Sequence, residues 1–252
     1  MIEILKVLSC MPFLLYACYS DIKTRRVVNE VWFVMFGVGY IFIVHDLVMY
    51  GFPYLIRNIL SFMFIFAFVY ILFQFGAFGG ADAKVLMVIS LIIPVYPVIT
   101  LGQTLLPFSG VPPINIFAFS VFANSVILTI VVPIGLLVYN LLKDPKTSLK
   151  KPLYMFIGYI MPINELQQGH FRMIESYSRT NEGVKFKFSR SGTDITSDVV
   201  SELQALYKSG KIEDGVWVTP GLPFMIPITA GFITAVVFGD LIFYLTMQFM
   251  ML

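Results

Sequence analysis

Two aspartates, Asp21 and Asp82, have surroundings that suit acid–base chemistry at a membrane. Asp21 ends the first apolar segment and opens the sequence Asp-Ile-Lys-Thr-Arg-Arg-Val-Val-Asn. Asp82 lies in Phe-Gly-Gly-Ala-Asp-Ala-Lys, residues 78–84, between two long apolar segments. An aspartate deep in a spanning helix costs roughly 3 kcal/mol, so an acid at a helix edge beside flexible glycines indicates a functional role. Two such carboxylates could form the catalytic pair of an aspartyl protease.

Amide hydrolysis by two aspartates assigns them different protonation states. One carboxylate takes a proton from water and one protonated carboxyl polarises the carbonyl, a split that like-charge repulsion enforces at close range. This chemistry requires no metal and no cofactor, and we expect none. The helix dipole favours a carboxylate at the start of a helix and disfavours one at its end. We therefore expect Asp82 to be the ionised base and Asp21 the protonated partner.

The composition is that of an integral membrane protein. Of the 252 residues, 58% are hydrophobic and 13% charged, and the mean hydropathy is +0.84, far from the usual values of soluble domains. The net charge of +2 is spread among both signs, which argues against nucleic-acid binding. Cys10 and Cys18 would lie about 12 Å apart along one helix, too far for a disulfide. Together with His45 and His170 they form no metal-ligand spacing.

Six apolar segments predict a membrane all-α fold with six transmembrane helices. The segments cover residues 2–20, 31–49, about 54–75, from Asp82 to about 100, about 114–142 and about 222–249. Most approach the ~20 residues that cross a hydrocarbon core of about 30 Å. Pro94 and Pro97 should end the fourth helix early, and Pro133 should bend the fifth. We do not expect the first segment to be a signal peptide, because its positive charges follow the apolar run.

Residues 143–220 have a different composition, with most of the charged residues and apolar runs too short to span. We expect a small cytoplasmic α+β domain between helices 5 and 6. Strands are predicted at 171–176, 184–188 and 216–219, with a turn at 181–183, and an amphipathic helix at 195–208 ending at Gly210. The expected domains are therefore residues 1–142 with helices 1–5 and both aspartates, 143–220, and 221–252 with helix 6.

The basic residues predict the orientation in the cell membrane. If six helices alternate, one side holds Lys23, Arg25, Arg26, Lys84, Lys143, Lys146, Lys150 and Lys151, whereas the loops of the other side hold Arg57 and His45. The positive-inside rule makes the first side cytoplasmic, with the N- and C-termini outside. Asp21 and Asp82 then both lie at the cytoplasmic edge.

Both aspartate sequences resemble motifs of one protease family. Residues 21–29 resemble the Asp-x-x-x-Arg-x-[Ile/Val]-x-Asn stretch of type IV prepilin peptidases, and residues 79–84 resemble their Gly-x-Gly-Asp-x-Lys motif. With six spans and a small cytoplasmic domain, the chain is similar over nearly its whole length to the archaeal preflagellin peptidases among these GxGD-type membrane aspartyl proteases. It departs at Ala81, where bacterial members and presenilins have Gly. It also lacks the four-cysteine insertion of many bacterial members.

The resemblance implies an aspartic endopeptidase with Asp21 and Asp82 as catalytic residues. Motif-supporting positions would be Gly79, Gly80, Ala81, Lys84, Arg25 and Asn29. The implied substrate is a preflagellin or pilin-like precursor, whose short basic leader is cut after a glycine at the cytoplasmic membrane edge. The implied partners are therefore such precursors and the lipid bilayer. Flexible glycines beside Asp82 would let it approach Asp21.

Other readings of the same residues remain open. Asp21 alone could be a solvated loop acid, Asp82 alone a helix cap, and the nearby cations could serve topology and head-group contacts. Asp240, about 27 Å along the sixth segment from Leu222, is expected to be a packing or interface acid. The functional alternatives are a presenilin-like protease that cuts within the bilayer, a transporter, and a non-catalytic membrane assembly protein. Against a transporter, we find no internal repeat.

Overall fold

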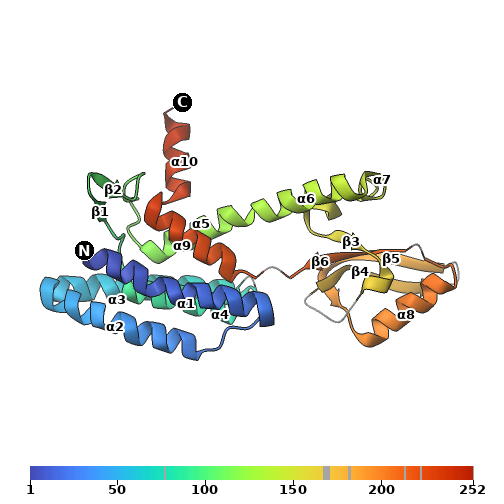
Figure 1. Ribbon diagram of the computed structural model, residues 1–252, viewed down its shortest axis with the longest axis horizontal. Helices are drawn as coiled ribbons and strands as arrows, with labels where there is room; N and C mark the ends of the chain where they lie inside the picture. Colours follow the sequence, from blue (N-terminus) through green and yellow to red (C-terminus); the bar gives the residue numbers. More distant parts are fainter. Residues whose placement is uncertain (77, 167–170, 181–182, 213, 222, 252) are drawn as a thin grey trace. The chain divides into compact units, whose positions relative to one another are not determined.

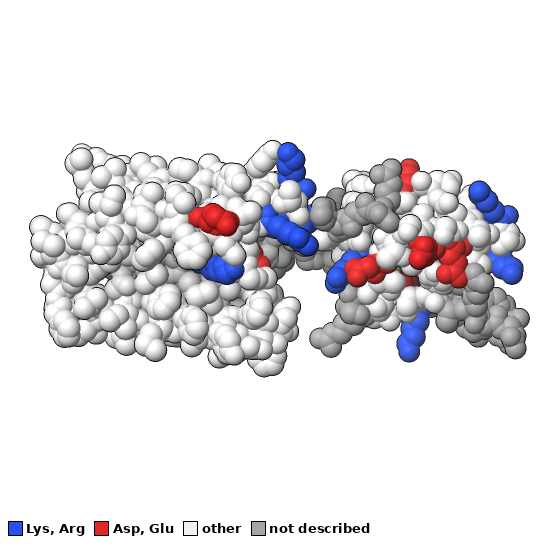
Figure 2. Space-filling view, turned by 90° about the horizontal axis from the view of Figure 1, so that it is seen from below, with Lys and Arg blue, Asp and Glu red and all other residues white. Residues whose placement is uncertain are grey.

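The computed structural model describes residues 1–252 except 77, 167–170, 181–182, 213, 222 and 252. The chain forms two compact units, one of residues 1–129 with 223–252 and one of residues 130–222. Figure 1 shows the first unit as helices with a small hairpin, and the second as a sheet with helices. Charged side chains are few on the face of the first unit seen in Figure 2 and numerous on the second unit.

The first unit is a helical bundle. Its helices are α1 (Ile2–Thr24), α2 (Glu30–Tyr50), α3 (Phe52–Gln74), α4 (Gly80–Ile92), α5 (Phe117–Thr129), α9 (Met225–Val237) and α10 (Leu241–Met250). α1 packs against α2 and α9, while α4 contacts α2, α3 and α5. The core between them contains fully buried apolar side chains such as Leu14, Ile89 and Phe232. Helix α4, which begins at the second motif, therefore has neighbours on several sides.

Several of these helices are long and apolar enough to cross a membrane. Among the described residues, α1, α2, α3 and the stretch Phe117–Lys143 meet this criterion. The pair α9 and α10 adds a fifth span if it counts as one, although it is bent by 56°. α4 has 13 residues, fewer than the ~20 of a straight crossing. The protein is thus a mostly helical, multi-pass membrane protein.

Prolines and glycines explain where these helices break. α4 ends at Ile92, shortly before Pro94, as predicted. The stretch 117–143 is interrupted at Ile130 between α5 and α6 (Val131–Lys143), because Pro133 has no N–H to donate to the carbonyl of Thr129. The break between α9 and α10 was not predicted. Gly239 has a φ of 101° there, which favours glycine.

Asp240 has a structural role at this break. It is 7% exposed and caps α10, since its carboxylate accepts the Phe243 N–H (2.9 Å) and the Ser120 hydroxyl. The neighbouring Asn124 donates to the Gly239 carbonyl and accepts the Leu241 N–H. These bonds satisfy the backbone groups freed by the break. The packing role expected for Asp240 is confirmed.

The first unit also contains a small β-hairpin that was not predicted from the sequence. Strands β1 (Ile99–Leu101) and β2 (Thr104–Leu106) pair antiparallel, and β1 begins within the predicted end of the fourth apolar segment. The turn between them contains Gly102, whose φ is 62°. Three-residue strands are too short to show the alternating pattern that identifies longer ones.

The second unit is built on a four-stranded antiparallel sheet in the order β3-β6-β4-β5. The strands are β3 (Tyr159–Met161), β4 (Phe171–Thr180), β5 (Gly183–Asp194) and β6 (Val216–Pro220), with helices α6, α7 (Pro145–Ser148), α8 (Ser197–Lys208) and the 3-10 helices η1 (Pro152–Phe156) and η2 (Ile163–Glu165). Leu203 of α8 packs into a core with Met173 and Val218.

The sequence located the main elements of this unit. The predicted strands and the helix ending at Gly210 are confirmed, although β4 and β5 run beyond their predicted ends. Strand β3 was not predicted. Residues 181 and 182 of the predicted turn lie outside the described residues. The small α+β region is therefore present.

Candidate active site

Asp21 lies in the last turn of α1 and is held by a distant helix. Its Oδ2 accepts the backbone N–H of Met225, the first residue of α9, at 3.2 Å. The first N–H groups of a helix have no partner inside it and carry partial positive charge, so a helix start favours a negative group. In the fold, the start of α9 therefore holds the Asp21 carboxyl in place through this hydrogen bond.

Cys18, one turn before Asp21, strengthens the same helix contact. Its Sγ lies 3.0 Å from the Thr229 hydroxyl and 3.3 Å from the Met225 carbonyl oxygen. Both partners belong to the first turn and a half of α9. α1 and α9 are thus joined by polar contacts next to the carboxylate, and Cys18 is a free thiol.

Asp82 lies in the first turn of α4, where its Oδ2 accepts the Gly79 N–H at 3.1 Å. The plainer reading of Asp82 as a helix-capping group is therefore realised in the structure. A Cβ added to Gly79 would lie 2.9 Å from that same Oδ2, whereas one added to Gly80 would have no atom within 4 Å. The two glycines consequently differ in purpose. The absence of a side chain at Gly79 leaves space for the Asp82 carboxyl, whereas a Cβ at Gly80 would contact no other atom.

Burial changes the protonation of Asp82, which lies outside the candidate spans. Burial raises the pKa of its carboxyl from 3.8 to about 6; the Gly79 hydrogen bond opposes this, and the negative charge of Asp21 adds to it. One pKa unit corresponds to about 1.4 kcal/mol, whereas a helix dipole contributes ~0.3–1 kcal/mol. Burial therefore outweighs the dipole of α4. The structure favours Asp82 as the protonated partner, the reverse of the assignment from helix dipoles.

The two carboxyls are electrostatically coupled without touching. The charge of Asp21 acts on the pKa of Asp82, so the fold brings the two motifs to the same end of the bundle. Throughout the described part of the chain, the hydrogen bonds of both carboxyls go to backbone N–H groups, those of Met225 and Gly79. No hydrogen bond joins the two carboxyls in this set.

Other motif residues connect the elements around the pair. The Lys84 ammonium donates to Asn29 Oδ1 at 2.6 Å, which ties the start of α4 to the start of α2. Arg25 ends α1 with a φ of 56°, unusual for a residue with a side chain, and donates its N–H to the Asp21 carbonyl at 3.0 Å. Ala81 packs at the edge of the core. The motifs thus position helix ends as well as the two acids.

Two models of known protein families match the chain. Residues 8–136 match the family model described as "Type IV leader peptidase family", and this range includes both aspartates. The chain belongs to the type IV leader peptidase family. Residues 150–241 match a second model, "Archaeal Peptidase A24 C-terminus Type II", and this range contains Met225. The resemblance noted from the two motifs is confirmed.

Curated relatives carry the same activity in their names. The chain is 32% identical to the preflagellin peptidase of Methanococcus voltae, over 90% of this chain and 92% of the relative. It is 28% identical to that of Methanocaldococcus jannaschii, over 90% and 91%, and 27% to that of Methanococcus maripaludis, over 90% and 92%. The protein is therefore a membrane-embedded aspartic peptidase of this family.

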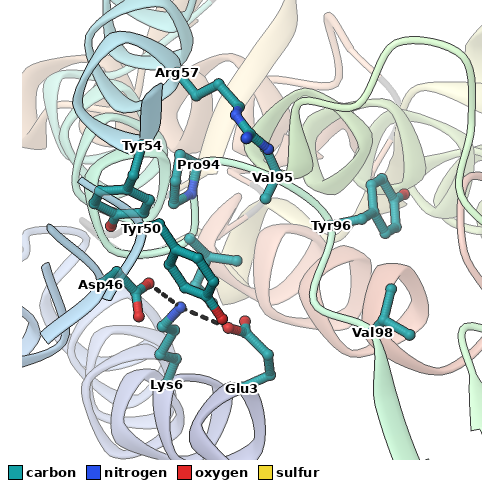
Figure 3. A pocket seen from close by; sticks show the side chains of 11 residues that line it. Glu3, Lys6, Asp46, Tyr50, Tyr54, Arg57, Pro94, Val95, Tyr96 and Val98 are labelled. Atoms are coloured by element: carbon teal, nitrogen blue, oxygen red, sulfur yellow. Dashed lines mark hydrogen bonds and ion pairs between the residues drawn. The ribbon is translucent and has the colours of Figure 1, made fainter. Parts of the chain in front are cut away.

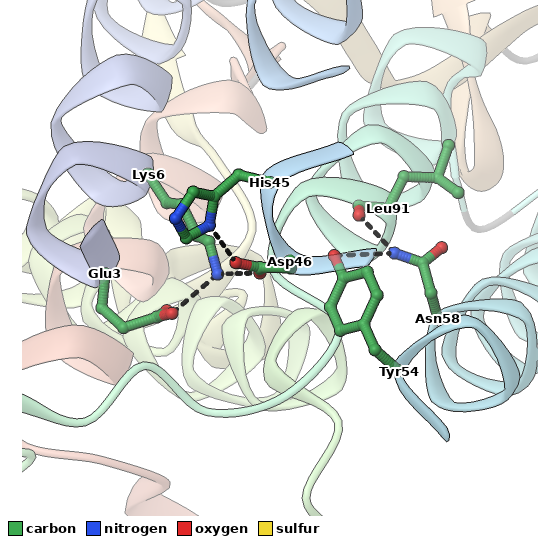
Figure 4. A network of polar contacts seen from close by, with 7 residues as sticks. All are labelled: Glu3, Lys6, His45, Asp46, Tyr54, Asn58 and Leu91. Atoms are coloured by element: carbon green, nitrogen blue, oxygen red, sulfur yellow. Dashed lines mark hydrogen bonds and ion pairs between the residues drawn. The ribbon is translucent and has the colours of Figure 1, made fainter. Parts of the chain in front are cut away.

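A second polar cluster lies at the other end of α1. Lys6 donates to Glu3 at 2.7 Å and to Asp46, and His45 Nδ1 lies 3.0 Å from Asp46 Oδ1 (Figure 4). Lys6 and Asp46 are 3% and 1% exposed. Fifteen residues of helix separate Lys6 from Asp21, about 22 Å, so this cluster is not part of the aspartate pair.

A cavity of about 250 Å³ adjoins the cluster (Figure 3). Its lining includes Glu3, Lys6 and Asp46 of the cluster together with Tyr50, Tyr54, Arg57 and Tyr96. Nearby, Asn58 donates to the Leu91 carbonyl at 2.7 Å and thereby ties α3 to α4. Sequence reasoning did not single out Lys6 or Asp46. The available signal was a charge inside an apolar segment, which by default requires a partner.

The part of the chain that the structure describes contains no group of three or more His, Cys, Asp or Glu side chains that could hold a metal ion. The arrangement provides two unequal carboxyls, one held by a helix start and one partly buried. This is the asymmetry that acid–base hydrolysis of an amide uses.

Proposed function

We propose that this peptidase removes the short basic leader from preflagellin or type IV pilin-like precursors, with Asp21 and Asp82 as its catalytic pair. The observation that carries the proposal is the electrostatic coupling of two acids from separate motifs, one of which is more readily protonated. The names of the relatives support the substrate class. The substrate contributes a peptide bond between a basic leader and an apolar helix.

In the proposed mechanism the two carboxyls exchange protons with water and the peptide. Asp21, oriented by the Met225 N–H, takes a proton from water as the water oxygen attacks the scissile carbonyl carbon. Asp82 donates its proton to the carbonyl oxygen, so the tetrahedral intermediate is neutral. Asp21 then passes its proton to the departing nitrogen, Asp82 recovers its own, and the C–N bond breaks.

We further propose six spans, with the part of α4 that follows Asp82 within the fourth and the broken pair α9–α10 as the sixth. Basic residues near α1, α4 and after α6 support a cytoplasmic location for the aspartates and for an accessory domain of residues 143–220, with both termini outside. Residues 1–142 and 221–252 then form the membrane part in the cell membrane. Digestion of right-side-out vesicles with a protease tests this topology: cleavage within 143–220 from outside would refute it.

Cleavage of a precursor tests the function. Membranes containing the protein are incubated with a precursor that has a basic leader, and the product masses are determined. Asp21→Asn and Asp82→Asn should each lower the rate by at least about 10³-fold. Asp240→Asn is the matched control, because asparagine caps helices as well as aspartate does. Substantial activity in either of the first two variants would refute the pair, and cleavage inside the apolar helix would indicate the presenilin-like alternative.

A further inference from the structure

An apolar groove of about 340 Å³ lies between α2, α3 and α4 in the first unit. Phe36 of α2, Phe62 of α3 and Val88 of α4 are among the side chains of its walls, and Asn29 and Lys84 lie at one end. That end coincides with the hydrogen bond between Lys84 and Asn29. The groove thus combines an apolar wall with a polar, positively charged mouth at the same membrane face as the aspartates.

The groove lies away from the chemistry of the aspartate pair. Successive helix residues are separated by 100°, so Asp82 is about 200° around α4 from Lys84. Lys84 and Val88 line the groove, whereas Asp82 belongs to the opposite face with the buried Leu86 and Ile89. A peptide bound at the carboxyls would not occupy this groove. Its occupant must be a different molecule.

Three donor groups with spare capacity among the described residues indicate which chemistry the groove would accept. The Lys84 ammonium has three N–H groups and donates one of them to Asn29 Oδ1. The Asn29 side-chain amide is next to the start of α2, where the helix dipole favours an anion. Trp32, one turn further in, lines the groove and is 4% exposed, yet its buried Nε1–H has no acceptor among the residues that the structure describes. A buried N–H without an acceptor is unfavourable, so a ligand oxygen is expected beside it.

We propose that the groove binds one membrane phospholipid with an anionic head group. The phosphate contacts Lys84 and Asn29, a linkage oxygen of the glycerol accepts the Trp32 Nε1–H, and one hydrocarbon chain lies along Phe36, Phe62 and Val88. Basic sites between transmembrane helices bind anionic head groups in this way. The lipid takes no part in peptide hydrolysis, so the proposal does not depend on the proposed substrate.

The scarcity of tryptophan makes the proposal testable by fluorescence. The chain has two tryptophans, Trp32 and Trp217, so Trp217→Phe leaves Trp32 as the single emitter. The full-length variant is placed in phosphatidylcholine nanodiscs, and phosphatidylglycerol or phosphatidylcholine with brominated chains is added. Brominated phosphatidylglycerol should half-quench Trp32 at a mole fraction about fivefold lower than brominated phosphatidylcholine, the preference expected of one lysine near an anionic lipid.

Variants separate a built site from ordinary contact with the bilayer. Lys84→Gln should abolish the preference and Lys84→Arg should keep it, while Lys23→Gln, at the same membrane face but outside the groove lining, should leave it unchanged. Equal quenching by the two lipids, or a preference that survives Lys84→Gln, would overturn the proposal. So would loss of the preference on adding a precursor, because the groove would then hold a polypeptide helix. Millimolar inorganic phosphate that removes the preference would show that only the head group is bound, and would also overturn it.

Discussion

Exchanging Gly79 for alanine should impair the peptidase, although the same exchange at Gly80 should not. Gly79 has a φ of −78° and a ψ of 158°, a conformation that alanine adopts freely, so backbone strain plays no part. Sterics decide the outcome. The new Cβ would lie 2.9 Å from Asp82 Oδ2, and the carboxyl must move by a few tenths of an ångström or more. It then weakens its 3.1 Å bond to the Gly79 N–H.

The size of the effect follows from that bond. Hydrogen bonds to charged groups contribute about 1.5–3 kcal/mol, and one pKa unit corresponds to about 1.4 kcal/mol. The Gly79 bond lowers the pKa of Asp82, so its loss should raise that pKa. Because the mechanism needs Asp82 protonated, activity falls as the pH rises through its pKa of about 6. Gly79→Ala should therefore move this high-pH limb upward, and displacement of the acid should lower kcat by roughly 10–100-fold.

The assay is cleavage of a precursor by purified protein between pH 4 and 8, with kcat and KM obtained at each pH. Gly80→Ala is the matched control, because a Cβ there meets no atom within 4 Å and alanine is a better helix former than glycine. Its kcat should stay within about twofold. If the two variants have the same pH profile, or if the high-pH limb of Gly79→Ala moves downward, the assignment of Asp82 as the acid is refuted.

Two further predictions concern stability, measured as the thermal unfolding midpoint in one detergent. Asp46→Ala leaves Lys6 buried without its main acceptor and should lower the free energy of unfolding by about 3–5 kcal/mol. Glu3→Gln changes a side chain that is 28% exposed and should lower it by less than about 1 kcal/mol. Equal shifts of the unfolding midpoint in the two variants would contradict the role of this cluster. Gly239→Ala should cost about 2 kcal/mol or more, because φ is 101° and its Cβ would overlap the Ser109 hydroxyl, while Gly37→Ala, with open space around its Cβ, should be neutral. A neutral Gly239→Ala would show that the break between α9 and α10 can relax.

The sequence alone determined the membrane class and the family, and it pointed to the two aspartates as the candidate pair. Composition and the length of the apolar segments are local properties, and so are the motifs at 21–29 and 79–84. The α+β region was also predictable from the sequence. Apolar residues such as Leu203 recur at helical spacing in α8, and β4 begins where the residues have higher β propensity. These signals come from residues close in the chain.

The tertiary structure decided the surroundings in which the two aspartates differ. The start of α9 reaches Asp21 across 204 positions of sequence, and the burial of Asp82 depends on everything packed around α4. From the sequence, the protonation of each aspartate was assigned from the dipole of its own helix. In the fold, the burial of Asp82 has a larger effect on its pKa than that dipole. The lipid-accepting groove arises in the same way, because Trp32, Phe62 and Val88 belong to three helices that become neighbours only when the chain folds.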